Sequence, residues 1–533
     1  MKQTPIFLLT LLLLAGASCK QQPARQQESP GADTDAEPAY REPHRPQFHF
    51  TPPAQWMNDP NGMFYLEGEY HLSYQYYPDS TVWGPMHWGH AVSRDLVRWE
   101  HLPVALEPDS LGYIFSGGTV VDTANTSGFG TREDPPVVAA FTHHNPDMEK
   151  AGRDDFQSQS IAWSLDKGRT WTKYSGNPVL ENKTGIRDFR DPKITWHPGT
   201  GKWVMALAVF DRVQFYGSPD LKTWSYLSDF GIPGDLRLWE CPDLFPLRDP
   251  ETGETRWVLL VSMQKEAPNG GTATSYFIGY FDGTRFIANP AEQQWLDWGT
   301  DNYAFVTWDH APLGPEARLG IGWMSNWQYA QQVPTEGWRS AMTLPRVLTL
   351  GTRDGEYFLN ASPAGALEAL RGERTDLGKL TITGEQDITG AFSPSQCEIL
   401  LHTALEQTTA TLFGITLTNG KGDRLILGFD RENRQLWVDR RQSGPQGFSG
   451  EFFTGPHTAP LGLQDLEDLR IYLDVASLEV FAGQGALNFT EIFFPSVPFD
   501  TLTFWADGGE WVVQSGAVFS LEGIWEHRAE GGL

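Results

Sequence analysis

Cysteine is scarce in this sequence, with three copies among 533 residues. Cys241 and Cys397 are far apart, and we place them in different domains, so we expect no disulfide between them. No pair of cysteines has metal-ligand spacing, and the 13 histidines form no such set either. The sequence therefore predicts no metal site and no cofactor.

Positive charge is also in short supply. Lys and Arg number 40 against 67 Asp and Glu, which gives a net charge of −27. Binding to nucleic acid needs a basic face that neutralises phosphates, so nucleic acid is excluded as a partner. The charge balance suits a protein that acts on a neutral substrate.

The apolar run at residues 5–14 is too short to cross a bilayer as a permanent helix. With Lys2 before it and small residues after it, it predicts an export signal over residues 1–19. Cys19 then resembles the lipidated cysteine of a bacterial lipoprotein, although Gly16 stands where an aliphatic residue is usual. We expect a lipid anchor on a bacterial membrane, at its periplasmic or cell-surface face. A plain secretory peptide with an incidental cysteine is the alternative.

The length of the chain predicts two folded domains after this signal. Residues 20–45 have almost no large apolar side chains, which predicts a disordered tether. We expect a first domain at 46–350, a linker at 351–374 and a second domain at 375–533. The second domain shows alternating strands with turn residues, which is typical of a β-sandwich.

Long helical periodicity is missing from the first domain, which reads as short strands separated by turns. A turn pattern with Ser, Asp and Trp recurs at residues 93–99, 164–171 and 218–224, with a looser copy at 280–286. The aspartates of these copies lie 71, 54 and 62 residues apart. A period near 60 residues fits one four-stranded blade of a β-propeller with generous loops.

A second series of segments marks the start of a strand in each repeat. Five such openings occur, at residues 58–60, 115–118, 190–192, 240–242 and 301–304. Five openings predict five blades, so the fold class is all-β, a five-bladed propeller followed by a sandwich. Since the innermost strands of a propeller all start around one end of its channel, Asp59, Asp191 and Glu240 should converge on one funnel.

Three convergent carboxyl groups suit the retaining hydrolysis of a glycoside, which needs two of them about 5–5.5 Å apart. Asn58 and Asn61 would stabilise a carboxylate at Asp59, and Arg190 would keep Asp191 ionised by charge pairing. Glu240 stands between Trp239 and Cys241, a partly apolar setting that favours its protonated form. The residues thus predict Asp59 as nucleophile, Glu240 as acid/base, and Asp191 as a fixed carboxylate that binds hydroxyls.

The segments Trp-Met-Asn-Asp-Pro-Asn-Gly at 56–62, Arg-Asp-Pro at 190–192 and Glu-Cys at 240–241 resemble glycoside hydrolase family 32, the fructan hydrolases, inulinases, levanases and invertases. The resemblance implies a five-bladed propeller with a C-terminal β-sandwich, and Asp191 as transition-state stabiliser. It further implies that the fructosyl unit is bound by Asn58, Gln75, Trp83, Phe115, Ser116 and Arg190. Gly118 and residues 475–476 depart from common family patterns, but neither departure touches the acids.

The tryptophans allow a division of roles. The chain has 21 of them, which suits all-β packing and sugar-stacking platforms in a cleft. Among Trp83, Trp88, Trp323 and Trp327, we expect only Trp83 to contact sugar, since most tryptophans of a propeller pack between blades. Cys241 is expected to be a small buried residue that shapes the strand of Glu240 rather than a reactive thiol.

The block at residues 322–346 looks most like exo-acting fructan hydrolases, which release terminal fructose from levan or inulin. An endo-acting levanase or inulinase, an invertase and a transfructosylase remain alternatives within the same chemistry. A non-catalytic fructan-binding lipoprotein should lack at least one acid, and all three are present. A sialidase would share the turn pattern at 164–171 but needs three convergent arginines, of which we see no set. The sequence leaves the oligomeric state open.

Overall fold

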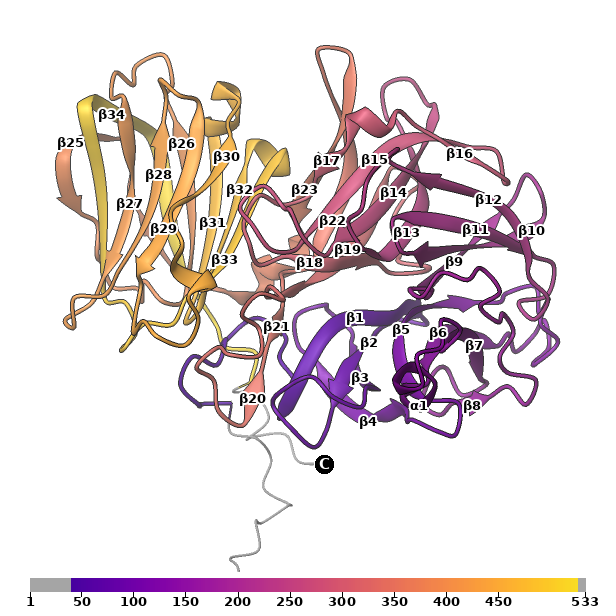
Figure 1. Ribbon diagram of the computed structural model, residues 1–533. Helices are drawn as coiled ribbons and strands as arrows, with labels where there is room; N and C mark the ends of the chain where they lie inside the picture. The colour runs from indigo at the N-terminus through magenta and orange to yellow at the C-terminus, as the bar shows by residue number, and fades with distance from the viewer. Residues whose placement is uncertain (1–39, 526–533) are drawn as a thin grey trace, which may run out of the picture. The chain divides into compact units, whose positions relative to one another are not determined.

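The structure, a computed structural model, describes residues 40–525, whose regular secondary structure is almost entirely β-strand (Figure 1). The one α-helix within this range is α1 (Pro146–Lys150). No helix among residues 40–525 is long and apolar enough to span a membrane. The predicted signal and Cys19 lie outside the described residues.

Five antiparallel sheets form the predicted five-bladed propeller, which is confirmed. The first three blades are β1 (Gln55–Leu66), β2 (Glu69–Tyr77), β3 (His87–Ser93), β4 (Glu100–Leu106); β5 (Tyr113–Val121), β6 (Val137–His144), β7 (Gln157–Ser164), β8 (Thr172–Lys173); and β9 (Arg190–His197), β10 (Lys202–Val209), β11 (Arg212–Ser218), β12 (Ser225–Gly231). The last two are β13 (Trp239–Arg248), β14 (Thr255–Met263), β15 (Ala273–Phe281), β16 (Phe286–Ile287), β17 (Gln294–Trp295); and β18 (Tyr303–Thr307), β19 (Ala317–Met324), β21 (Ala341–Met342), β22 (Arg346–Arg353), β23 (Glu356–Pro363). Each of the five predicted openings is the start of an innermost strand, or lies within its first residues.

The repeated turn pattern connects the third and fourth strands of the first four blades. In the turn between β11 and β12, Asp220 accepts hydrogen bonds from Ser218 Oγ, from the backbone N–H groups of Lys222 and Thr223, and from Thr223 Oγ1. Asp95, Asp166 and Asp282 accept equivalent backbone bonds in their own turns. Each aspartate therefore supplies acceptors that the turn cannot supply from its own backbone.

The ring of blades is closed by β20 (Trp338–Arg339), which pairs in parallel with β1. The chain between β19 and β22 thus returns from the fifth blade to the edge of the first. This pairing joins segments that lie almost 300 residues apart, roughly the whole length of the propeller.

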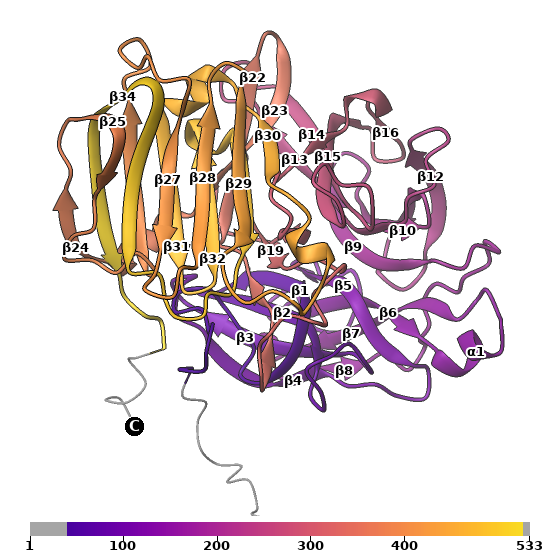
Figure 2. The ribbon, with the colours of Figure 1, turned by 60° about the vertical axis from the view of Figure 1, so that its left-hand side comes forward.

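The C-terminal strands form the predicted sandwich around an apolar core (Figure 2). They are β24 (Arg371–Asp376), β25 (Leu380–Asp387), β26 (Cys397–Thr403), β27 (Leu412–Thr418), β28 (Arg424–Asp430), β29 (Gln435–Gln442), β30 (His457–Pro460), β31 (Asp468–Asp474), β32 (Ser477–Ala482), β33 (Leu487–Ile492) and β34 (Thr501–Leu521). The first part of β34 pairs with β27 and the last part with β26. Gly508 and Gly509, both at positive φ, lie where the strand passes from one layer to the other.

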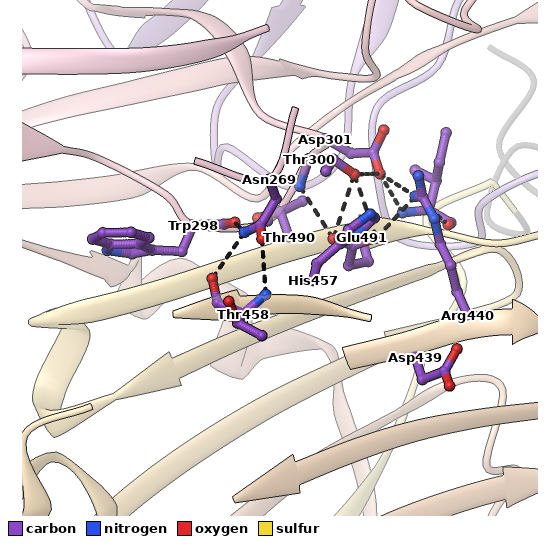
Figure 3. Close-up of polar contacts among 12 residues, drawn as sticks. Asn269, Trp298, Thr300, Asp301, Asp439, Arg440, His457, Thr458, Thr490 and Glu491 are labelled. Atoms are coloured by element: carbon purple, nitrogen blue, oxygen red, sulfur yellow. Dashed lines mark hydrogen bonds and ion pairs between the residues drawn. The ribbon is translucent and has the colours of Figure 1, made fainter. Parts of the chain in front are cut away.

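Buried ion pairs join the propeller to the sandwich (Figure 3). Arg440 Nη1 of β29 lies 2.6 Å from Asp301 Oδ2, just before β18, and 2.9 Å from Glu491 Oε2 of β33. His457 Nδ1 is 2.7 Å from the other oxygen of Glu491. Separating the partners would leave buried charges uncompensated, which is costly. The paired groups therefore hold the start of β18 against the sandwich.

Two predicted boundaries differ from the structure. The range 351–374, given as a linker, contains β23, the 3-10 helix η2 (Gly365–Leu370) and the start of β24. Asp354 and Gly355, both at positive φ, make the tight hairpin between β22 and β23 that completes the fifth blade. Residues 40–45, given to the tether, include the buried Tyr40, whose ring stacks on Trp525 at 4.0 Å, and the buried Arg45.

Candidate active site

All nine residues predicted for the site line one cavity of about 420 Å³. They come from the openings of the inner strands β1, β5, β9 and β13 and from nearby segments. The predicted members are Asn58, Asp59, Gln75, Trp83, Phe115, Ser116, Arg190, Asp191 and Glu240, and they are joined by His144, Glu149, Phe156, Gln157, Arg187, Asp188, Gln264, Trp327 and Gln331. The structure thus brings together acids that stand as far as 181 positions apart in the chain.

The inner strands carry β-bulges where they face this cavity. The pairing register shifts at Glu240–Asp243 in β13 and at Tyr303–Val306 in β18. Within the bulged openings, Asp191, Cys241 and Ala304 have φ values of 64°, 46° and 52°. Such left-handed backbone is costly for residues other than glycine, and it gathers where a strand must re-aim a side chain at a functional site.

Asp59 is a buried carboxyl group with donors on both oxygens. Ser116 Oγ donates to Oδ2 at 2.6 Å, and the Cys241 thiol approaches the same oxygen at 3.5 Å. Asn58 Nδ2 donates to Oδ1 at 3.0 Å, while Trp56 Nε1 holds the Asn58 amide in orientation at 2.8 Å. Burial raises the pKa of Asp59, the nearby Glu240 charge raises it further, and the hydrogen bonds oppose both effects.

The predicted support of Asp59 by two amides is half right. Asn58 contacts the carboxylate as expected. Asn61 instead donates to the backbone carbonyl of Asp59 at 2.6 Å and accepts from the Gly117 N–H at 2.8 Å. Asn61 therefore ties the opening of β1 to that of β5 rather than stabilising the acid directly.

The predicted charge pairing of Arg190 with Asp191 is present but long, and it does not outweigh the effect of burial on the Asp191 carboxyl group. The closest approach of the two groups, from Arg190 Nε to Asp191 Oδ2, is 3.9 Å, and the hydrogen bond to Oδ2 comes from the Cys241 N–H at 3.1 Å. Burial raises the pKa of Asp191 to about 7, with Arg190 opposing and the charges of Glu240 and Asp59 adding to the rise.

Arg190 contacts Glu240 instead. Its Nε and Nη2 lie 3.2 and 2.9 Å from Glu240 Oε1, and its Nη1 lies 2.6 Å from Asp188 Oδ1. The Tyr303 hydroxyl donates a short hydrogen bond to Glu240 Oε2. The apolar setting predicted for Glu240 is therefore wrong, since a guanidinium and a phenol are its partners.

Tyr303 is a functional residue that the sequence analysis missed. Its side chain is buried, and burial raises the pKa of the phenol well above its usual value, so the group remains a donor. The segment 301–304 was recognised as the fifth strand opening, but no residue of it was assigned to the site. The signal that could have found it is that each of the other four strand openings carries a polar residue.

The aromatic residues divide much as predicted. Trp83 is 37% exposed and meets the Phe115 ring edge-on at 5.9 Å, whereas Trp88 and Trp323 are fully buried. Trp327 differs from the expectation, because it lines the cavity while also contacting the Trp56 ring at 5.9 Å. Two tryptophans, one from each side of the cavity lining, are thus available to a sugar.

Cys241 is buried between two of the acids, 3.5 Å from Asp59 Oδ2 and 3.7 Å from Asp191 Oδ2. Burial raises the pKa of its thiol well above the usual value, so it stays protonated and is a weak donor. Both Cys241 and Cys397 are free. Within residues 40–525 no group of three His, Cys, Asp or Glu side chains is arranged to hold a metal ion.

Two buried carboxyl groups, Asp59 and Asp191, and the partly buried Glu240 come from separate inner strands of a five-bladed propeller and share a cavity with aromatic walls, which defines a glycoside hydrolase. Residues 49–362 match the glycosyl hydrolases family 32 N-terminal domain, and residues 366–521 match the family 32 C-terminal domain. The chain belongs to glycoside hydrolase family 32.

Named relatives agree with this assignment. The chain is 45% identical to a levanase of Bacillus subtilis over 501 residues, which cover 93% of this chain and 73% of that protein. It is 36% identical to an extracellular exo-inulinase of Aspergillus niger over 490 residues, 86% of this chain and 90% of that protein. Among solved structures it resembles the exo-inulinase of Aspergillus awamori, with a TM-score of 0.82, 33% identity, and coverage of 91% of this chain and 100% of that one.

Proposed function

We propose that this glycoside hydrolase is a retaining β-fructosidase that releases fructose from the non-reducing ends of levan or inulin, and from sucrose. The names of its relatives, a levanase and exo-inulinases, support a fructan substrate. A related fructofuranosidase of Schwanniomyces occidentalis, 30% identical, has been solved with fructosylnystose. The observation that carries the proposal is the single cavity shared by Asp59, Asp191 and Glu240.

In the first half of the reaction, Asp59 attacks the anomeric carbon of the terminal fructosyl unit. Glu240 gives its proton to the glycosidic oxygen, the bond to the leaving group breaks, and a fructosyl ester forms on Asp59. In the second half, Glu240 takes a proton from water as the water oxygen attacks the same carbon. Fructose leaves with retained configuration, and Asp59 is again a carboxylate.

The surrounding groups fit these roles. Arg190 and Tyr303 donate to Glu240, which stabilises the carboxylate that is present after the first proton transfer. Ser116 and Asn58 donate to Asp59 and fix its orientation for attack. Asp191 would bind fructosyl hydroxyls and stabilise the transition state, while Gln75, Trp83 and Phe115 line the space for the sugar.

Release from chain ends is favoured over internal cleavage by the size of the cavity. Its volume of about 420 Å³ lies near the lower end of the ~300–1,000 Å³ typical of small-molecule pockets. Such a space suits one end of a chain better than an extended segment. An endo-acting enzyme would need a groove open on both sides of the acids.

The test of the proposal is a product profile over time on levan, inulin and sucrose, with Glu240→Ala as control. Fructose alone from the first minutes on a polymer supports the exo-acting β-fructosidase. A ladder of oligosaccharides would contradict it and favour the endo-acting alternative, and longer fructosides made from sucrose would indicate transfructosylation. If no fructoside is cleaved, the chain is a fructan-binding lipoprotein instead.

We further propose that the protein is exported and anchored to a bacterial membrane through lipid on Cys19. The support is the sequence of residues 1–19 and the fact that several relatives are named as extracellular enzymes. In a bacterial host, the native chain should stay in the membrane fraction. A Cys19→Ala variant that fractionates identically would contradict the anchor.

A further inference from the structure

A second cavity, of about 1270 Å³, lies against the fourth blade, about three times the volume of the active-site cavity. Its walls come from the end of β15, from β16 and β17, from the β22–β23 hairpin and from the sandwich residues Pro460, Ala486 and Leu487. Figure 1 shows β15, β17 and β23 as neighbours in this part of the molecule. No residue of this cavity belongs to the site described above. We call it the blade-4 groove.

The part of the blade-4 groove that Tyr280 lines is far along the fourth blade from Glu240, whereas Gln294 and Trp295 lie nearer to the level of Glu240, on the outer side of β15. In the strand register, Glu240 is opposite Ser262, and Ser262 is opposite Thr274. Tyr280 follows Thr274 by six residues along β15, which at ~3.3 Å per residue places it roughly 20 Å further along the blade. A disaccharide in the active site therefore cannot reach Tyr280.

The lining of the groove combines flat apolar faces with hydrogen-bonding groups. Tyr280, 51% exposed, and Tyr357 flank the Arg256 guanidinium, whose carbon lies 4.4 and 4.8 Å from the two ring centroids. Trp295 and Phe358 add further aromatic surface. Rings beside amide and guanidinium donors suit a sugar, which presents an apolar C–H face and a rim of hydroxyls.

Two polar atoms among the lining residues lack partners. Arg256 Nε and Gln293 Nε2 are both buried and make no hydrogen bond within the described part of the chain. Because each atom has almost no solvent-accessible surface, a ligand in the groove would reach it only if the lining side chains moved. The lining also carries Glu292, Asp354 and Glu356, so a neutral ligand fits better than an anionic one.

We propose that the blade-4 groove is a non-catalytic binding site for β-fructan chains. The inference rests on the proposed fructan substrate and adds a second point of contact with it. A polymer held in the groove keeps its chain ends at a high local concentration near the active site, whereas short substrates gain nothing. The groove should therefore lower the KM for polymer and leave the hydrolysis of sucrose unchanged.

The test compares Tyr280→Ala with Tyr226→Ala, which removes a tyrosine of similar exposure, 54%, from β12 outside the groove. Each is measured for KM and kcat on levan, inulin and sucrose. Each is also built into the inactive Asp59→Ala background and run through native gels that contain levan or inulin. Thermal unfolding of all variants reports whether the fold is intact.

We expect Tyr280→Ala to raise the KM on at least one polymer about three- to tenfold and to abolish its retardation in the gel, with sucrose kinetics unchanged. Tyr226→Ala should behave like the wild type. Equal polymer KM and equal retardation in all variants would overturn the proposal, as would a parallel loss of sucrose hydrolysis. Because gel retardation is read in an inactive background, absence of hydrolysis would sink the proposed function without affecting this test.

Discussion

At the scale of single residues, the hydroxyl of Tyr303 is one of two groups that donate hydrogen bonds to Glu240, the proposed acid/base. The phenol reaches Glu240 Oε2 from the fifth blade, while Arg190 reaches Oε1 from the third. A donor favours the ionised form of a carboxyl group over the protonated form. The acid/base therefore depends on residues from two other blades.

Tyr303→Phe removes this donor and keeps the ring. We expect kcat/KM on sucrose to fall about tenfold, since acid–base groups contribute roughly 10²–10⁴-fold in total. The loss should be seen across the pH profile of kcat/KM, because the phenol that donates to Glu240 Oε2 is missing at every pH. Tyr74→Phe, a buried tyrosine of β2 whose hydroxyl lies 3.4 Å from His101, is the control. A Tyr303→Phe profile that superimposes on the wild type would contradict this role.

The sequence was sufficient to predict the nine lining residues, because the three acids stand at strand openings and the family resemblance supplied the other six, including Gln75 and Trp83, which lie outside the openings. It was insufficient for their pairing. Arg190 and Asp191 are adjacent in the chain, but their charged groups come no closer than 3.9 Å, and Arg190 makes its hydrogen bonds to Glu240 and Asp188 instead. The pairs that form, Arg190 with Glu240 and Tyr303 with Glu240, join residues 50 and 63 positions apart.

At the scale of elements, every blade has a bulged opening at the active-site end, and the first four blades also have an aspartate turn between their outer strands. The bulges and the turns have different roles. The bulges orient catalytic side chains at a cost in backbone strain, whereas the turns only stabilise the blade. Changes in the turns should therefore affect stability without affecting catalysis.

Asp220→Ala tests this separation. The carboxylate accepts four hydrogen bonds, so its loss should lower the free energy of unfolding by about 1–3 kcal/mol, the cost of leaving such donors unpaired. Sucrose kinetics at 25 °C should stay within twofold of the wild type. Asp229→Ala on β12, which removes only a surface contact of 3.4 Å with Arg212, should cost less than about 0.5 kcal/mol. Denaturant titrations measure the free energy of unfolding of both variants. Equal decreases for Asp220→Ala and Asp229→Ala would contradict the stabilising role of the turn.

The number and order of strands were predictable because the turn pattern and the openings repeat. The end of the fifth blade was not predicted, although Asp354 and Gly355 are a common hairpin pair. The strand after them carries only moderately apolar residues, since β23 is an outer strand that is half-buried. Without the repeated turn pattern, which the fifth blade lacks, this segment resembled a linker.

At the scale of the whole molecule, the two domains are joined by charged groups that are buried rather than exposed. His49 lies between Asp474 Oδ2 at 2.7 Å and Glu479 Oε1 at 3.0 Å, and Arg346 contacts both Glu479 and Asp297. Burial alone would lower the pKa of His49, but the two carboxylates outweigh it and raise the pKa to about 9. The protonated imidazole is therefore part of the folded state at neutral pH.

We expect the folded protein to lose stability in mild alkali, because His49 loses its proton there. Its pKa is higher when folded than when unfolded, so its contribution is full below pH 6.5 and is lost as the pH rises through about 9. The loss is on the order of 3 kcal/mol, from a shift worth about 1.4 kcal/mol per unit. His49→Gln should be less stable at pH 6 and should lose little more by pH 9.5, in thermal unfolding scans. His402→Gln, at an exposed histidine, should follow the wild-type curve.

The closure of the ring of blades determines when the active site is completed during synthesis of the chain. Asp59 meets Cys241 across 182 positions, and β1 is completed only by β20, which is made after all five inner strands. A ribosome that has made four blades has therefore made every catalytic acid, yet no partner strand for the edge of the first blade. Contacts of such long range form late in folding. We therefore expect hydrolysis to begin only after β20 has been made and has paired with β1.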